Sequence, residues 1–78
     1  MYTVYIIRDN NGKLYKGMTN NLERRIREHR SGKTITTSRM SDFLVVYTEE
    51  FSEMRDARKR EVYLKSAAGR RFLKKVIT

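Results

Sequence analysis

Four side chains capable of acid–base and phosphate chemistry stand in the N-terminal part of the chain, namely Tyr5, Tyr15, Arg25 and His29. A phenol and an imidazole can each give or take a proton, and a guanidinium can neutralise charge on a phosphate oxygen. Cleavage of a phosphodiester needs both functions, because a nucleophile must be activated while negative charge develops on the phosphate. A phenol has an ordinary pKa of about 10, so we expect Arg25 or a metal ion to lower the pKa of the reacting tyrosine.

A fifth candidate, Glu61, stands where an apolar residue is expected. It falls on the same helical stripe as Ala57 and Leu64, and a carboxylate there is costly unless it is paired or binds a metal ion. Two interpretations stay open. Glu61 forms an ion pair with Arg58 or Lys65, each one helical turn away, or it ligates a divalent cation.

The charge balance points to a polyanionic partner. Eighteen Lys and Arg residues against nine Asp and Glu residues give a formal net charge of +9 and an isoelectric point near 10.3. Such a protein gains affinity for nucleic acid because each phosphate contact releases condensed counterions. The basic residues fall on several predicted elements and not on one face of an amphipathic helix, which argues against a membrane-surface role.

Length and cysteine usage limit the architecture. We expect one domain over residues 1–78, close to the smallest size at which a hydrophobic core suffices without other support. The absence of cysteine excludes disulfides and thiolate metal sites, and favours the cytoplasm over secretion. No apolar run approaches the roughly 20 residues of a membrane span, and the N-terminus lacks the core of a signal peptide.

The elements that must position these groups begin with a β-hairpin. Residues 2–8 and 13–19 are rich in β-branched and aromatic side chains and flank a turn signal at residues 9–12. Both stretches therefore predict strands.

The length of the hairpin loop decides whether the two tyrosines share a face. A three-residue loop, with Gly12 in the left-handed conformation, pairs Tyr5 with Gly17 and places both tyrosines on one face. A two-residue loop would pair Tyr5 with Met18 and turn Tyr15 to the opposite face. We favour the three-residue loop. Gly17 fits it too, because a glycine opposite Tyr5 leaves an open floor beside the phenol, although a simple bulge glycine is an equally open interpretation of Gly17 alone.

A first helix is predicted from Asn20 or Asn21 to about Gly32. Asn20 as the N-cap would produce a capping-box pattern, and glycine is typical of the position after a helix end. Arg25 and His29 are four residues apart and therefore lie on one face of this helix.

A polar segment and a third strand follow. Residues 31–42 are rich in hydroxyl groups and predict a loop, in which Lys33 and Arg39 suit contacts to phosphate oxygens. Residues 43–51 predict the strand, and their apolar run at 44–47 indicates cover on both faces.

Two helices complete the predicted chain. The second begins with Ser52 as its N-cap and is broken by Gly69. Its expected apolar stripe consists of Met54, Ala57, Leu64 and Ala68. A short basic helix at residues 70–77 is expected to turn three side chains toward the core: Phe72, Leu73 and Val76.

Taken together, these residues resemble the GIY-YIG nuclease superfamily. Val4-Tyr5-Ile6 and Tyr15-Lys16-Gly17 correspond to its two motifs, with Arg25 and His29 in the following helix and Glu61 in the next. Each tripeptide is a weak signal alone, but their order and spacing are specific.

The resemblance covers essentially the whole chain and includes three departures. Residues 59–66 and 69–73 are similar to small stand-alone bacterial members of the superfamily. Thr3 replaces the glycine of the first motif, Lys16 replaces the isoleucine of the second, and no asparagine follows Glu61.

The resemblance implies an α/β fold in which helices flank a three-stranded, mostly antiparallel sheet in the order ββαβαα. It also implies metal-dependent hydrolysis of DNA. Tyr5 and Tyr15 would lie near the scissile phosphate and activate or position water. Arg25 would neutralise the phosphate, His29 would shuttle a proton, and Glu61 would hold a single Mg²⁺ or Mn²⁺ ion.

Two function classes stay open at this point. One is an endonuclease for DNA, which includes branched, damaged or single-stranded forms, with an unidentified protein partner to target it. The other is a non-catalytic nucleic-acid-binding module on the same fold. In both classes the residues expected to contact the nucleic acid are Lys16, Gly17, Lys33, Arg39, Arg58 and Lys65.

Overall fold

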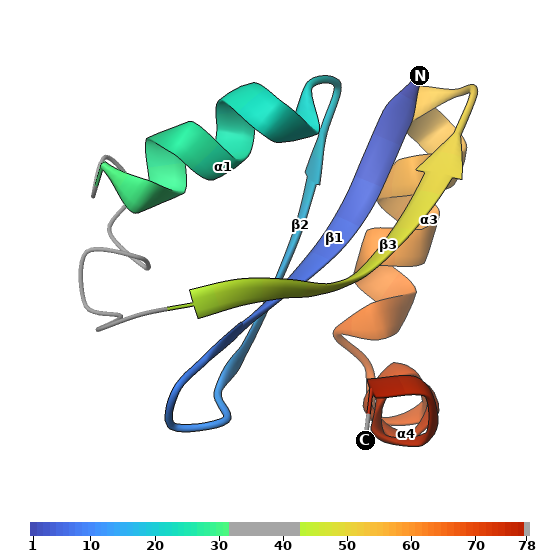
Figure 1. Ribbon diagram of the computed structural model, residues 1–78. Helices are drawn as coiled ribbons and strands as arrows, with labels where there is room; N and C mark the ends of the chain where they lie inside the picture. The colour runs from blue at the N-terminus through green and yellow to red at the C-terminus, as the bar shows by residue number, and fades with distance from the viewer. Residues whose placement is uncertain (32–42, 78) are drawn as a thin grey trace.

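The computed structural model describes residues 1–31 and 43–77, and over these ranges it confirms the predicted α/β fold and its ββαβαα order (Figure 1). The elements in chain order are β1 (Tyr2–Asp9), β2 (Leu14–Thr19), α1 (Leu22–Arg30), β3 (Phe43–Phe51), α3 (Met54–Leu64) and α4 (Ala67–Ile77). None of the helices in these ranges is long and apolar enough to cross a membrane.

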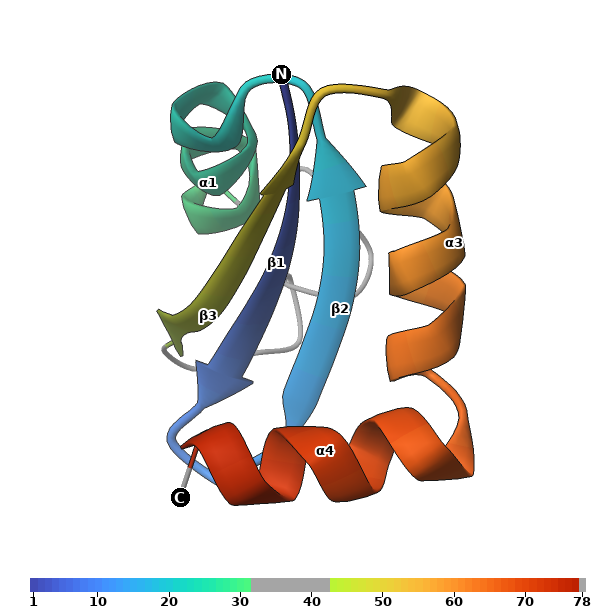
Figure 2. The same cartoon turned by 90° about the vertical axis from the view of Figure 1, so that its right-hand side faces the viewer.

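The three strands form an antiparallel sheet in the order β2-β1-β3. Helix α1 covers one face of the sheet, α3 covers the other, and α4 runs across the lower end of the strands (Figure 2). The central strand β1 is therefore the one enclosed on both faces, and its residues from Thr3 to Ile7 are all buried.

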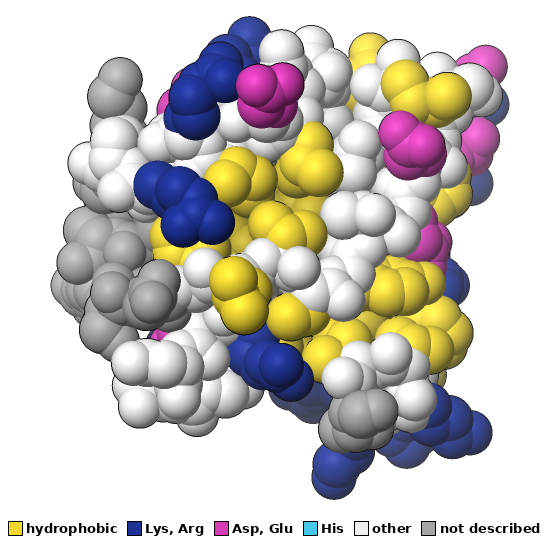
Figure 3. Space-filling model, in the orientation of Figure 1, with side chains coloured by type: hydrophobic (Ala, Val, Ile, Leu, Met, Phe, Trp, Pro, Cys, Tyr) yellow, Lys and Arg dark blue, Asp and Glu magenta, His cyan; other side chains and the backbone are white. Residues whose placement is uncertain are grey.

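The expectation that the third strand is covered on both faces is wrong. β3 lies at an edge of the sheet, where Leu44 is exposed and the next three residues are only half-buried. Apolar side chains are visible at the surface on this side of the molecule (Figure 3). An apolar run alone does not separate a central strand from an edge strand with a partly covered face.

The hairpin adopts the three-residue loop, as predicted. Tyr5 pairs with Gly17, Ile7 pairs with Tyr15, and Gly12 has a φ of +84°. The turn is stabilised by Asp9, whose Oδ1 accepts hydrogen bonds from the backbone N–H groups of residues 11 and 13 at 2.9 and 2.8 Å. Side chains that alternate along β1 consequently face α1 or α3.

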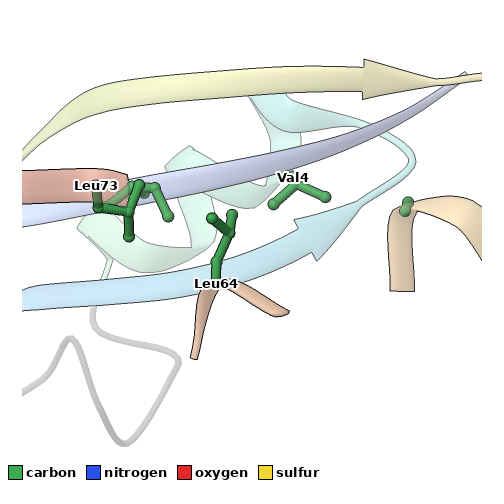
Figure 4. Close-up of a cluster of buried hydrophobic side chains, with 5 residues drawn as sticks. Val4, Leu64 and Leu73 are labelled. Atoms are coloured by element: carbon green, nitrogen blue, oxygen red, sulfur yellow. The ribbon is translucent and has the colours of Figure 1, made fainter. Parts of the chain in front are cut away.

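Two small hydrophobic clusters lie on opposite faces of the sheet. The cluster under α3 and α4 is built from Val4, Ile6, Ala57, Leu64 and Leu73 (Figure 4). The cluster under α1 is built from Tyr5, Ile7 and Phe43, with Tyr15, Leu22 and Ile26 packed against it. The candidate tyrosines thus belong to the α1 side.

Helix α1 begins after Asn21 and not after Asn20. The Asn21 side chain accepts a hydrogen bond from the backbone N–H of Arg24 at 3.0 Å, which satisfies an N–H group without an intrahelical partner. The helix ends at Arg30 with Ser31 as its C-cap. The predicted end at Gly32 lies outside the described residues.

The predicted boundaries of the last two helices need correction. The N-cap of α3 is Glu53 and not Ser52, and α3 ends at Leu64, well before Gly69. Gly69 is buried inside α4, where a Cβ atom would come within 2.5 Å of the Leu64 Cα. Gly69 therefore permits close packing of the α3–α4 junction and does not break a helix.

The predicted apolar stripes are corrected at three positions. Met54 is exposed, Ala68 belongs to α4, and Val76 is exposed. Leu73 is buried as expected, and Ile77 packs against the core where Val76 was predicted to do so.

A polar cluster fastens α3 to β3. Arg60 donates to both carboxylate oxygens of Glu49, at 2.9 and 3.0 Å, and Tyr47 also donates to Glu49. Burial raises the pKa of the Glu49 carboxyl, but the hydrogen bonds from Arg60 and Tyr47 outweigh it and leave the pKa below its ordinary value. The Arg60 guanidinium also lies 4.8 Å from the ring centre of Phe72 on α4. Because Glu61 follows Arg60, this cluster also fixes the rotation of α3 that orients Glu61.

Candidate active site

The candidate site is centred on the phenol of Tyr5. Its oxygen lies 2.9 Å from His29 Nε2 and 3.3 Å from Arg25 Nε. Tyr15 lies beside the same imidazole, with ring centres 5.4 Å apart in an edge-on arrangement. The fold thus brings together the four side chains that the sequence singled out, from β1, β2 and α1.

The chemistry of the donor groups determines the direction of each hydrogen bond in this cluster. Arg25 Nε can only donate, so the Tyr5 oxygen accepts that hydrogen bond. The phenol proton is then directed at His29 Nε2, which accepts it when the imidazole is neutral with its proton on Nδ1. The cluster forms a directed chain from Arg25 through Tyr5 to His29.

Burial is the largest influence on the pKa values of Tyr5 and His29, the two buried members of this hydrogen-bond chain. Burial raises the pKa of Tyr5 above 10.0, and the hydrogen bond and charge of Arg25 oppose this rise without overcoming it. Arg25 thus acts in the predicted direction, but without a metal ion it does not bring the pKa of Tyr5 below its ordinary value. Burial, followed by the charge of Arg25, lowers the pKa of His29. At neutral pH the phenol keeps its proton and the imidazole is uncharged.

The four groups differ in their access to solvent. Tyr5 and His29 are each only 1% exposed, whereas Arg25 and Tyr15 are half-buried. Arg25 Nη1 also forms an ion pair with Glu28 Oε1 at 3.1 Å. A bound phosphate would thus meet Arg25 and Tyr15 first, and it would compete with Glu28 for the guanidinium.

Gly17 makes room for the Tyr5 side chain on the edge strand β2. A Cβ atom at this position would come within 2.5 Å of the Tyr5 Cζ and would also collide with the phenol oxygen. This observation favours the interpretation of Gly17 as a close-approach glycine, because it stands in regular register opposite Tyr5.

Glu61 lies on α3, on the opposite side of the sheet from α1. Its negative charge contributes to the raised pKa of Tyr5, after burial and the Tyr15 contribution, so it lies near enough to act on the phenol. Both predicted ion pairs form, with Lys65 Nζ at 3.4 Å and Arg58 Nη1 at 3.9 Å. The two cations are 55% and 70% exposed, whereas the Glu61 side chain is only 13% exposed. Water can therefore solvate either cation without Glu61.

The donor set fits a weakly held divalent ion better than a preformed metal centre. In residues 1–31 and 43–77 no group of three or more His, Cys, Asp or Glu side chains is placed to hold a metal ion. One largely buried carboxylate suits Mg²⁺, which keeps several waters and takes further ligands from substrate phosphates.

Three of the residues predicted to contact nucleic acid, Lys16, Lys65 and Arg58, are linked through Glu61 and through the charge of Lys65 on Lys16. Lys16 lies near Arg70 and Lys65, whose charges contribute to the lowering of its pKa after burial. Arg58 is exposed and paired with Glu61. Lys33 and Arg39 lie outside the described residues.

Two residues of the site were not identified from the sequence. Glu28 holds the Arg25 guanidinium, and the spacing of three residues between them in a helix is a signal that could have found this pair. Phe43 packs edge-on against His29, with ring centres 6.2 Å apart. No local pattern indicates this contact, because it depends on how β3 pairs with β1.

A tyrosine–histidine–arginine cluster, built on the first hairpin and first helix of a ββαβαα sandwich, is the arrangement expected of a GIY-YIG domain. The family model described as the GIY-YIG catalytic domain matches residues 1–75, and the chain belongs to this family.

Proteins similar to this chain include UPF0213 proteins. The chain is 41% identical over 66 residues to one from Clostridium perfringens, with 83% of this chain and 71% of that protein covered. It is 35% identical over 74 residues to one from Staphylococcus haemolyticus, with 94% and 90% covered. A solution structure of a UPF0213 protein from Bacillus halodurans aligns with a TM-score of 0.60 and 32% identity, over 96% of this chain and 84% of that one.

Proposed function

We propose that this protein is a metal-dependent endonuclease that hydrolyses phosphodiester bonds of DNA. Membership of the GIY-YIG family supports a nuclease-type function. The observation that carries the proposal for this chain is the directed hydrogen-bond chain from Arg25 through Tyr5 to His29. Such a chain can move a proton away from an attacking water and stabilise charge on a phosphate.

The proposed roles follow from exposure and protonation. Arg25 and Tyr15, the members that solvent reaches, would contact the phosphate. The Tyr5 oxygen would take a proton from the attacking water while its own proton passes to His29 Nε2, once the guanidinium has turned toward the phosphate. The water oxygen forms the new bond to phosphorus, and the leaving oxygen is protonated from solvent. A raised pKa of Tyr5 suits this relay, because the phenol never has to persist as an anion.

Glu61 is the residue that would hold a single Mg²⁺ or Mn²⁺ ion. When bound, such an ion acts as a Lewis acid that polarises a phosphate oxygen. The carboxylate suits this role because Lys65 and Arg58 are solvated enough to release it. Branched, damaged or single-stranded DNA, a role in repair or recombination, and action in the cytoplasm belong to the same proposal.

The first test replaces Glu61 by glutamine. We expect Glu61→Gln to abolish Mg²⁺-dependent or Mn²⁺-dependent nicking of plasmid DNA and to change the free energy of unfolding by less than about 1 kcal/mol, because the paired cations are mostly exposed. Nicking is measured by gel, and stability by thermal melts with and without the ion. Glu50→Gln on β3, which removes an exposed carboxylate, is the matched control and should behave as wild type.

Two outcomes would count against the proposal. Nicking that persists in Glu61→Gln would remove the assigned metal ligand. A wild-type protein that binds DNA but cleaves no branched, flapped, nicked or single-stranded substrate with either ion would instead establish the non-catalytic binding module.

A further inference from the structure

A basic groove lies between the loop end of the β1–β2 hairpin and α4, away from the Tyr5 cluster. Its volume is about 290 Å³. Four cationic side chains line it, Arg8, Lys16, Arg70 and Lys74, and no carboxylate stands among its lining residues in the described part of the chain. Lys and Arg side chains project around α4 in the space-filling view (Figure 3), and the helix itself crosses the ends of the strands (Figure 2).

Two cations of this groove, Lys16 and Arg70, lie close enough to repel each other. Burial lowers the pKa of Lys16, and the charges of Arg70 and Lys65 lower it further. A fold that gathers like charges around a concavity becomes more stable when an anion enters, so the groove is electrostatically complementary to phosphate.

The floor of the groove is apolar. Its apolar lining residues are Leu14, Leu73 and Ile77. Leu73 is only 1% exposed, so the half-buried Leu14 and Ile77 supply the apolar surface that a ligand can reach. A phosphate alone gains nothing from such a surface, whereas a nucleotide can bury one face of its base against the aliphatic side chains while its phosphate meets the cations. In a duplex the base faces are stacked and paired, so only an unpaired base can reach the floor.

We propose that this groove binds a single-stranded segment of nucleic acid. Arg70 and Lys16 hold the backbone, and the base of an unpaired nucleotide rests on Leu14 and Ile77.

Lys65 connects the groove to Glu61, the proposed metal ligand on the same side of the sheet. Lys65 acts on Lys16 and also forms the 3.4 Å ion pair with Glu61. A strand held in the groove would therefore lead toward the carboxylate that we assign to the metal ion. In this respect the inference rests on the proposed function and adds its substrate class, a nucleic acid with an unpaired strand beside the scissile bond. Binding in the groove itself requires no cleavage.

The test measures binding without divalent ions, so that it does not depend on catalysis. We expect Arg70→Glu to weaken binding of an oligothymidylate about tenfold and to lower the slope of log affinity against log salt by about 0.7, since one phosphate contact is lost. The matched control is Arg55→Glu, which makes the same charge change at an exposed position near the start of α3, at the other end of the sheet from α4 (Figure 2). It should change the affinity less than threefold, or about 0.6 kcal/mol.

Further probes separate the alternatives. An abasic oligonucleotide of equal length should bind the wild type several-fold more weakly than the oligothymidylate, and a duplex should be less sensitive to Arg70→Glu than the single strand. An oligouridylate arm distinguishes RNA from DNA. Equal losses in Arg70→Glu and Arg55→Glu, or equal binding of abasic and intact strands, would overturn the proposal. Binding to vesicles that contain phosphatidylserine provides a further control: if Arg70→Glu weakens vesicle binding but leaves oligothymidylate binding unchanged, the proposal is also overturned. If the groove binds single strands as expected but no substrate is cleaved, the proposed nuclease function fails and the proposed binding site is retained.

Discussion

At the scale of single residues, the Tyr5 phenol joins packing to chemistry. Its ring belongs to the hydrophobic cluster under α1, while its oxygen is bonded to Arg25 and His29. Burial raises the pKa of this phenol and lowers that of His29, so both groups are neutral where a proton relay requires them to be. The same packing fixes the geometry, because a buried ring has few alternative rotamers.

The fit of Tyr5 against Gly17 predicts a specific loss. Gly17→Ala places a methyl group against the phenol and should destabilise the fold by about 2 kcal/mol, as overpacking does. It should also displace Tyr5 from His29, so that the imidazole pKa measured by NMR changes and any nuclease activity disappears. Gly12→Ala is the control. It strains a residue with a φ of +84° but meets no atom within 4 Å, so it should lower stability without changing the imidazole pKa.

His29 is the only histidine of the chain. Its titration should therefore be detectable as a change of the free energy of unfolding with pH. Its pKa in the folded protein lies below the ordinary value of 6.5, so the unfolded chain binds a proton first as the pH falls. The stabilising contribution is complete above about pH 6.5 and is lost as the pH falls through the folded pKa, with a slope of up to about 1.4 kcal/mol per pH unit.

Urea unfolding measured between about pH 7 and pH 5 checks this dependence. His29→Gln removes the titrating group, and its free energy of unfolding should change less over this range than that of the wild type. Parallel pH profiles for the two proteins would show that His29 is not held neutral by the fold.

At the scale of elements, the junction of α3 and α4 controls how the second layer meets the sheet. α3 ends at Leu64, and the Ser66 hydroxyl accepts a hydrogen bond from the Gly69 N–H at 3.2 Å. Leu64 and Leu73, one from each helix, then pack into the same cluster as Val4 (Figure 4). This packing also carries Arg70 to the groove and places Lys65 near Lys16.

The close approach at this junction predicts that Gly69→Ala is strongly destabilising. The added methyl group would collide with the Tyr63 carbonyl oxygen and the Leu64 Cα, both of which are backbone atoms that cannot turn away. We expect a loss of about 3 kcal/mol in the free energy of unfolding by urea. Ala68→Gly, which changes the neighbouring residue in the opposite sense, should cost only about 1 kcal/mol through helix propensity. A Gly69→Ala protein as stable as wild type would contradict the packing described for α3 and α4.

The sequence predicted the elements and the Tyr5 cluster because both depend on short-range patterns. Gly12 identified the loop that places Tyr5 and Tyr15 on one face, and the spacing of Arg25 and His29 placed both on one side of α1. Features set by long-range packing were missed. Gly69 looks like a helix breaker from the sequence, but it is required by the distance between two helices.

The pKa shifts of the site could not be predicted from the sequence either. The pKa of Tyr5 is decided by a competition between burial and Arg25, and burial cannot be read from residue types. The groove beside α4 was missed for a related reason. Arg8 and Arg70 are far apart in the chain, and only the fold brings them to one concavity.

At the scale of the whole molecule, the protein combines a small hydrophobic core with a large positive net charge. The formal net charge of +9 is distributed over both faces of the sheet, with Arg25 on the α1 side and Arg70 on the α4 side. Self-repulsion of this size opposes folding, and the Arg60–Glu49 pair relieves only part of it. An anionic partner that covers several of these cations at once should therefore both bind and stabilise the protein.

This distribution predicts steeply salt-dependent binding of nucleic acid with little sequence preference. If about four phosphates of a duplex are neutralised, each contributing a slope of about 0.9, affinity should fall about a hundredfold between about 50 and 200 mM salt. Fluorescence anisotropy with two duplexes of unrelated sequence checks both parts, since phosphate contacts carry no sequence information. A thermal melt at each salt concentration shows whether the protein stays folded while affinity is lost. A salt-independent affinity, or a large preference for one sequence, would mean that the cations of the sheet faces do not form the binding surface, and the nuclease and the binding module would both lose their electrostatic basis.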